Sequence, residues 1–332
     1  MTRLIVLAAG LGVFMVAPRV LERLGSAPPK WRVRLALLTV LGMAASSVSL
    51  LSVILFPEAL LASSMSDMWH SETIHELVKQ PPLRAASIIA GVILGFLLFR
   101  FLWALISMAR STSRARVRGD REAVSLAGGG SIFVLPVERP MAYSLGHGEG
   151  QVVVSRGLFG ALDRSELRAV LLHEEGHVRS RDHGRILVVR AIRHALGLLP
   201  PVRAAADAME QAMEEAADEH AAARLGDPAV VASALSKAAL SGLETPPGAL
   251  SLTSEIDVLG RVHRLLEPPL VPHWMPWACL AVAGALLAFL ALTQVMVGLA
   301  ILAATHHLLS ASAVAVTPVP PAFRFAAIKA VG

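Results

Sequence analysis

Long apolar blocks separated by polar segments dominate the sequence. Four of them are long enough to cross, as helices, the roughly 30 Å hydrocarbon core of a bilayer; they cover about residues 4–21, 33–56, 85–108 and 274–304. No small-residue cleavage site follows the first block, so we expect a retained membrane helix there and not a removed signal peptide. Arg100 lies inside the third block, where it either reaches back to the membrane surface or serves as a functional charge.

Basic residues gather beside these blocks and predict the orientation of the chain. One cluster precedes the second block and another follows the third; the members are Arg19, Arg23, Lys30, Arg32, Arg34, Arg110, Arg114, Arg116 and Arg118. Because positively charged flanks stay in the cytoplasm, we expect a multi-pass protein of the cell membrane with its N-terminus outside. The predicted domains are three membrane helices in 1–110 with an outer loop at 57–84, a cytoplasmic domain at 111–272, a fourth membrane helix in 273–305 and an outer tail at 306–332.

The polar segment at 111–272 has the pattern of a small domain with a few strands and several helices. The short runs "AGGGSIFVLP", "MAYSLG" and "GQVVVS" are rich in β-formers and predict a small sheet or hairpin. Asp163 and Glu166 have the spacing of a capping box, which predicts the start of a helix. Further helices are expected over 186–199, which two prolines end, over 202–225, which Gly226 ends, and from Pro228 onward. The expected fold class is therefore mainly α, with an inserted α+β domain.

Composition agrees with this organisation and excludes some functions. Of the 332 residues, 55% are hydrophobic and 17% charged, and the net charge is +5. The basic residues lie beside apolar blocks and form no basic stripe interleaved with aromatics, so direct nucleic-acid binding is not expected. The one cysteine, Cys279, lies in an apolar block. An internal disulfide and a cysteine-based metal site are thereby excluded.

The stretch "LLHEEGHVRS" carries the candidate chemistry. His173 and His177 are four residues apart, so on a helix they share one face and can bind one metal ion. Nitrogen ligands favour zinc. Glu174 follows the first histidine and is placed to take a proton from a metal-bound water. The alternative is that these residues form the solvated polar end of a surface helix.

A catalytic zinc site needs a third protein ligand, and "MEEAADEHAAARLG" offers one. Glu214 and Asp218 are four residues apart and share a helix face. Glu214 is the candidate ligand and Asp218 the candidate partner for a histidine N–H. Glu215, one residue further along, competes for the ligand role. The alternative is an exposed acidic face.

These residues resemble those of the integral-membrane gluzincin peptidases. The motif pair "VVVSRGLFGALDRSELRAVLLHEEGH" and "EEAADEHAAARLG", together with "RPMAYSLG" and "RDH", is most similar to the beta-lactam sensor-transducer family of antirepressor proteases. The HtpX-like and CAAX-prenyl-type proteases share the zinc motifs. The resemblance implies a zincin-like metallopeptidase domain that holds one Zn²⁺. It also implies His173, His177 and Glu214 as ligands and Glu174 as the catalytic glutamate.

The resemblance also has departures, and some residues stand beside it. Ala217 occupies a position where the sensor-transducers often have cysteine, and we expect no penicillin-binding sensor domain after the fourth block. Asp218 is implied as the supporting acid. His183 is a candidate for supporting one of the metal-binding side chains, Tyr143 for oxyanion stabilisation or plain packing, and Arg224 for substrate or carboxylate binding.

The expected function is a membrane-bound zinc endopeptidase that cleaves a transcriptional repressor or itself in signalling. One alternative is quality control of membrane proteins, as in HtpX-like enzymes. Another is a non-catalytic receptor with a structural zinc, against which Glu174 argues, since a structural site needs no general base. The expected partners are a protein or peptide substrate, membrane lipid and a second copy of the chain.

Overall fold

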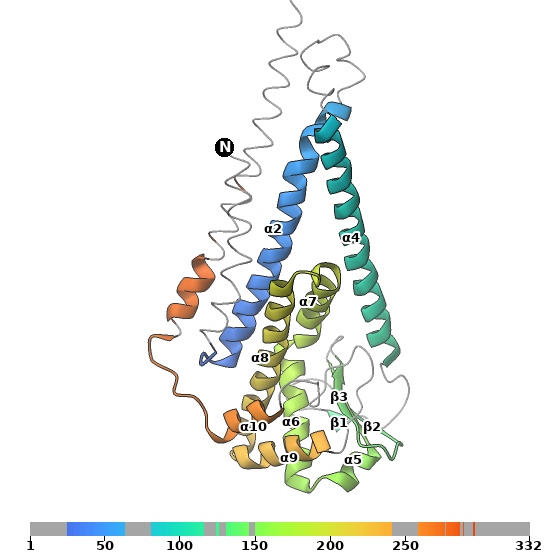
Figure 1. Ribbon diagram of the computed structural model, residues 1–332. Helices are drawn as coiled ribbons and strands as arrows, with labels where there is room; N and C mark the ends of the chain where they lie inside the picture. Colours follow the sequence, from blue (N-terminus) through green and yellow to red (C-terminus); the bar gives the residue numbers. More distant parts are fainter. Residues whose placement is uncertain are drawn as a thin grey trace, which may run out of the picture. The chain divides into compact units, whose positions relative to one another are not determined.

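The computed structural model describes residues 25–63, 81–115, 124–125, 131–145, 150–240, 258–275 and 277–285, together with 288 and 295 (Figure 1). The chain divides into two compact units, and the larger one comprises 11–45 and 96–290. The elements in order are α2 (Pro29–Ser63), α4 (Pro81–Ala115), β1 (Val124–Ser125), β2 (Ser131–Leu135), β3 (Ala142–Leu145), β4 (Gln151–Ser155), α5 (Arg156–Ala161), α6 (Arg164–Ser180), α7 (Asp182–Leu196), α8 (Pro200–Leu225), α9 (Pro228–Leu240) and α10 (Val258–Leu266). The described chain is thus mainly helical with one small sheet, as the sequence predicted.

Two helices, α2 and α4, are long and apolar enough to cross a membrane. The qualifying segments are Pro29–Ser49 and Ile88–Ser113, which overlap the second and third apolar blocks. The predicted first span lies outside the described residues. Most of the predicted fourth span also lies outside them, and its described part is helical over 277–285. Four spans therefore remain a prediction.

The predicted outer loop at 57–84 is shorter than expected. Helix α2 continues through Pro57 to Ser63, and α4 begins at Pro81. The sequence after Pro57 contains Glu, Ala and Leu, which are strong helix formers. The prolines at the start of α4 occupy its first turn, where no N–H is needed.

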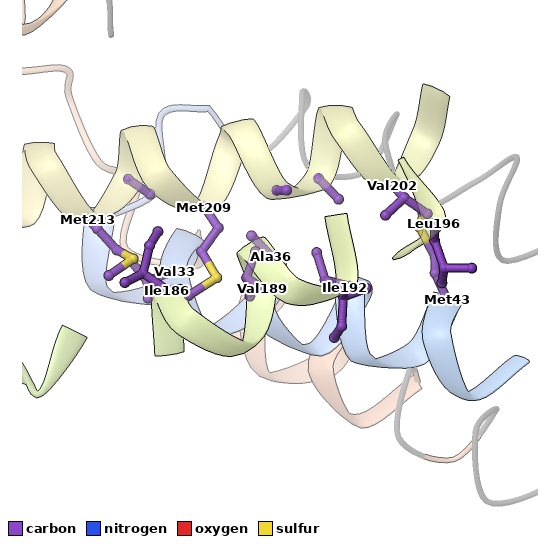
Figure 2. Close-up of a cluster of buried hydrophobic side chains, with 14 of the residues drawn as sticks. Val33, Ala36, Met43, Ile186, Val189, Ile192, Leu196, Val202, Met209 and Met213 are labelled. Carbon is purple, nitrogen blue, oxygen red and sulfur yellow. The ribbon is translucent and has the colours of Figure 1, made fainter. Parts of the chain in front are cut away.

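The first half of α2 belongs to a helical core. About 50% of its apolar segment is buried, against 11% for that of α4. Figure 2 shows Val33 near Met213 at one end of this cluster and Met43 near Leu196 and Val202 at the other. Because α7 and α8 supply most of the remaining side chains, the start of α2 packs directly on the helix that follows the histidine motif and on the helix that carries Glu214.

Arg100 of α4 also contacts this helical layer. Its guanidinium donates a hydrogen bond of 2.5 Å to the carbonyl oxygen of His194 in the last turn of α7. A cation there complements the negative end of the helix dipole. Arg100 therefore has a specific partner on α7.

The sheet is small and mixed. Its order is β1-β2-β4-β3; β2 and β4 are parallel, and β3 is antiparallel to β4. Successive strand residues point to opposite faces. Ala142 packs with the apolar face of α6, whereas Tyr143 packs with Phe133 and Val153 on the other face. Strand β3 therefore lies at the edge of the described sheet, next to α6.

Helix α6 starts at the predicted capping box. Asp163 Oδ1 accepts hydrogen bonds from the backbone of Ser165 and Glu166, and Glu166 Oε2 accepts one from the backbone of Asp163. The helix ends at Arg181, whose φ of 54° is left-handed. Because this single residue reverses the chain, α7 begins at Asp182, four residues earlier than predicted. The prolines expected to end α7 instead open α8.

Glu166 also joins α6 to α9, and we expect this contact to contribute to stability. Burial raises the pKa of Glu166, but hydrogen bonds from Lys237 and Ser233 outweigh this and hold it below the ordinary 4.5. Glu166→Gln should lower the free energy of unfolding by about 1–2 kcal/mol at pH 7, since Lys237 is half-exposed and partly screened.

The pH dependence of the same variant provides the check. A lowered folded-state pKa stabilises the protein above the unfolded value, and the effect is lost as the pH falls through the folded value. The difference between wild type and Glu166→Gln in denaturant unfolding should therefore shrink as the pH falls below 4.5. A difference that stays constant with pH would show that the charge of Glu166 contributes nothing.

Candidate metal site

Three side chains from two helices converge in the interior of the larger unit. His173 and His177 of α6 are fully buried, and Glu214 of α8 is 3% exposed. The Nε2 atoms of the histidines are 3.2 Å apart, and the Glu214 carboxylate oxygens lie 3.5 Å and 3.6 Å from them. Ligands about 2.0–2.1 Å from a tetrahedral zinc are separated by about 3.3 Å. These separations are close to that value, and one ligand atom from each residue lies within 4.8 Å of the other two, so the three residues can hold one zinc ion.

Asp218 fixes the orientation of His173. Its Oδ1 lies 2.9 Å from His173 Nδ1, which leaves Nε2 facing Glu214. Arg261 of α10 donates from Nε to Asp218 Oδ2 at 2.7 Å and from Nη2 to Oδ1 at 2.8 Å, and its Nη1 is 3.2 Å from Glu214. A carboxylate on the far nitrogen of a metal-binding histidine sets its tautomer and raises its basicity.

Asp182 has the same relation to His177. Its Oδ2 lies 3.2 Å from His177 Nδ1, and Arg185 donates to its other oxygen at 3.3 Å. The left-handed turn at Arg181 allows this contact, because it brings the first residue of α7 back beside the last turns of α6. Both imidazoles are thus held from their Nδ1 side.

Charge balance in the site favours a cation. Burial lowers the pKa of His173, but the carboxylates of Asp218 and Glu214 outweigh this and raise it to about 9. Burial would raise the pKa values of Glu214 and Asp218, but Arg261 and the histidines hold both below their ordinary values. The carboxylates are therefore ionised, and binding of a metal ion to the imidazoles releases protons.

Glu174 lies beside the triad with its carboxylate unsatisfied. The residue is fully buried, and within the described part of the chain neither carboxylate oxygen makes a hydrogen bond of ordinary geometry. Burial raises its pKa, although the two histidines and the nearby hydroxyl of Ser144 oppose this. A buried polar group without a partner is costly, so this position calls for a ligand or a water held by a metal.

Glu215, the competing ligand candidate, points elsewhere. It contacts Arg32 of α2, Arg264 of α10 and Gln211. Glu214 is therefore the residue that faces the histidines. The Cα of Arg224 lies ten residues beyond that of Glu214 along α8, which corresponds to about 15 Å at 1.5 Å per residue.

The remaining sequence candidates are Tyr143 on β3, His183 on α7 and Arg224 on α8. Tyr143 is buried on the face away from α6, and its burial raises its pKa; the structure thus gives it a packing role and does not bring it to the triad. His183 Nε2 lies 2.6 Å from the carbonyl oxygen of Ser144 on β3. Arg224 Nη2 lies 3.9 Å from a carboxylate oxygen of Glu175, the residue that follows Glu174 in α6.

Two residues of the site were missed by the sequence analysis. Arg261 lies 43 positions after Asp218, on a short helix that was not predicted, and its only signal is one basic residue in an amphipathic run. Asp182 lies within "RDH", but contact with His177 needs a left-handed arginine. Non-glycine residues rarely adopt that conformation, so the pattern could not indicate it.

Two histidines one turn apart on one helix, a glutamate on a second helix and an unpaired glutamate beside them form the donor set of zinc metallopeptidases. Comparison with family models matches residues 132–318 to peptidase family M48. The match covers more than half of the chain, so the chain belongs to this family.

Curated relatives agree with the HtpX part of the resemblance. A protease HtpX homologue of Aquifex aeolicus is 39% identical over 70 residues, which are 20% of this chain and 23% of that protein. One of Pyrococcus abyssi is 32% identical over 113 residues, 30% of this chain and 39% of that protein. The chain thus matches well under half the length of these relatives. No solved structure matches it.

Proposed function

We propose that this chain is a membrane-bound zinc endopeptidase with His173, His177 and Glu214 as ligands and Glu174 as the general base. The observation that carries the proposal is the convergence of three buried ligand atoms within 4.8 Å of one another, with the buried carboxylate of Glu174, which makes no hydrogen bond of ordinary geometry, on the same helix as the histidines. Membership of peptidase family M48 supports the same activity.

The residues would divide the hydrolysis of a peptide bond as follows. When bound, zinc supplies a Lewis acid that activates water and polarises the scissile carbonyl. Glu174 takes one proton from the water and gives it to the departing amine, while the hydroxyl goes to the carbonyl carbon. Asp218 and Asp182 keep both Nε2 atoms directed at the metal position. Arg261 balances the charges of Glu214 and Asp218.

The edge strand is the proposed place for the substrate backbone. The backbone N–H of Ser155 donates to the carbonyl oxygen of Met141, and the N–H of Met141 donates to the Ser155 hydroxyl. By strand alternation the backbone N–H and C=O of Tyr143 also face β4, whereas those of Ala142 and Ser144 face away from the sheet. An extended peptide can pair with such an edge. His183 already contacts the outward carbonyl of Ser144, so we expect pairing to begin at Ala142 or to displace this imidazole.

The substrate class is also part of the proposal. One candidate is misfolded membrane proteins, which the resemblance to HtpX-like enzymes implies and with which the matches to HtpX homologues agree. Cleavage of a transcriptional repressor or of the chain itself is the second candidate, supported by the motif resemblance to the sensor-transducers. For either one, the proposed peptidase domain is 111–272 on the cytoplasmic side of a multi-pass membrane protein.

The first test uses the full chain in detergent and its metal content. We expect about one zinc per chain and cleavage of an unfolded membrane protein or of the chain itself. Removal of zinc with a chelator should abolish cleavage, and restored zinc should recover it. Cleavage that continues in the zinc-free protein would refute the metallopeptidase mechanism. Cleavage of a purified repressor but of no membrane protein would favour the signalling role.

A further inference from the structure

Glu215 sits at the centre of an ion-pair network that the proposed chemistry does not use. Its side chain is 5% exposed, and the guanidinium of Arg32, near the start of α2, contacts its Oε2. Arg264 Nε of α10 is 3.1 Å from the same oxygen, and Gln211 donates to Oε1 at 3.1 Å. One buried carboxylate thus joins three helices next to the metal ligand Glu214.

Arg264 extends the network to the segment before α2. Its Nη2 donates to the carbonyl oxygen of Ala27 at 3.3 Å and its Nη1 to that of Gly25 at 3.4 Å. The same Nη2 lies 3.7 Å from Glu219, one turn beyond Glu215 on α8. The start of α2 is therefore fastened to α8 by Arg32 and to α10 by backbone carbonyls.

Helix α10 carries a second arginine that holds the metal site itself. Arg261 and Arg264 are three residues apart, about one turn. The first is 1% exposed and contacts Glu214 and Asp218, whereas the second contacts Glu215 and the α2 start. Two paths consequently connect α2 to Glu214. One passes through the adjacent Glu215, and the other through α10 and Arg261.

From these contacts we propose that Arg32, Glu215 and Arg264 are positioning residues that couple the start of the candidate membrane helix α2 to the proposed zinc ligand Glu214. The inference rests on the proposed function, because it assigns a regulator to the same site. A shift of α2 would move the charge that holds Glu215, and Glu215 is the neighbour of a ligand whose position must hold to a fraction of an ångström. The membrane helix would thereby set the metal affinity of the site.

The test is a double-mutant cycle on zinc affinity, measured by competition with a chromogenic chelator on the full chain. Arg32→Met and Glu215→Gln should each weaken zinc binding about tenfold, the lower end of the effect of outer contacts on metal sites. Since both variants remove the same contact between Arg32 and Glu215, the double variant should bind zinc as tightly as Glu215→Gln alone. Turnover should fall with little change in KM.

Arg190→Met is the matched control. Arg190 forms two hydrogen bonds with Glu210, which lies on α8 one turn before Glu214. It links α7 to α8 and leaves the start of α2 untouched. We expect a similar change in melting temperature and unchanged zinc affinity. Arg32→Lys, which keeps the charge, should bind zinc within about threefold of wild type. If Arg32→Met does not fold, Arg32→Gln, which also removes the charge, replaces it with the same expected loss.

The outcomes separate the inference from the proposed function. If wild type binds no zinc, the proposed function fails and the inference with it. If wild type binds zinc but Arg32→Met matches Arg190→Met in affinity, only the coupling is refuted. Additive losses in the double variant would also refute it, because the two residues would then act independently.

Discussion

Glu174→Gln should abolish peptide hydrolysis while the protein still binds zinc. General base catalysis contributes about 10²- to 10⁴-fold to rate, and an amide cannot accept the proton from water. Glutamine has nearly the shape of glutamate, and Glu174 is not one of the three converging ligand atoms. The measurement is zinc content by mass spectrometry together with cleavage of an unfolded membrane protein and self-cleavage.

Glu175→Gln is the control for this experiment. Glu175 is also buried and adjacent in sequence, but its carboxylate lies 3.9 Å from His220 and from Arg224 and is not among the three converging ligand residues. We expect near-normal cleavage from it. If Glu174→Gln cuts as well as wild type, Glu174 is not the base. If neither protein cuts any substrate although both hold zinc, a receptor with a structural zinc becomes the better hypothesis.

Arg261→Met should have the largest effect on stability and metal binding of any change outside the ligands. The substitution leaves Glu214 and Asp218 buried without their cation. Removal of one partner from a buried ion pair costs about 3–5 kcal/mol. Loss of the support of a ligand weakens metal affinity about 10- to 100-fold. Thermal unfolding with and without zinc, and chelator competition, measure the two effects.

Arg185→Met provides the comparison for Arg261. Arg185 contacts Asp182, which holds the other histidine, but its side chain is 44% exposed. Exposed pairs contribute about 0–1 kcal/mol, so both stability and zinc affinity should stay near wild type. Arg261→Met with wild-type zinc affinity would show that Arg261 supports only the fold of α10. In that case the charge balance of the site would have to come from the metal alone.

The family assignment supports the predicted class of peptidase but not the particular family that the motifs resembled most. The motif pair predicted a membrane gluzincin, and membership of peptidase family M48 with matches to HtpX homologues supports that class. A specific relation to the beta-lactam sensor-transducers is not shown. The zinc motifs are shared among these groups because they encode the chemistry, whereas substrate and signal depend on other surfaces.

Local patterns predicted the elements near the site well. The capping box of Asp163 and Glu166 fixes the start of α6 through contacts within one turn, so neighbours in sequence determine it. Gly226 ends α8, as predicted, and the structure shows that it does so in a left-handed conformation. By contrast, α7 begins at Asp182 because Arg181 adopts a left-handed conformation that no local signal favours.

The sequence by itself determined that His173 and His177 share a helix face and that Glu214 and Asp218 share another, because helical spacing is a local property. Only the tertiary structure decided which acid meets which histidine, that Glu214 and not Glu215 faces them, and that Arg261 balances the charge. These choices depend on how α6, α8 and α10 pack. Packing brings together residues more than 40 positions apart, and these contacts cannot be predicted from the spacing of the residues in the sequence.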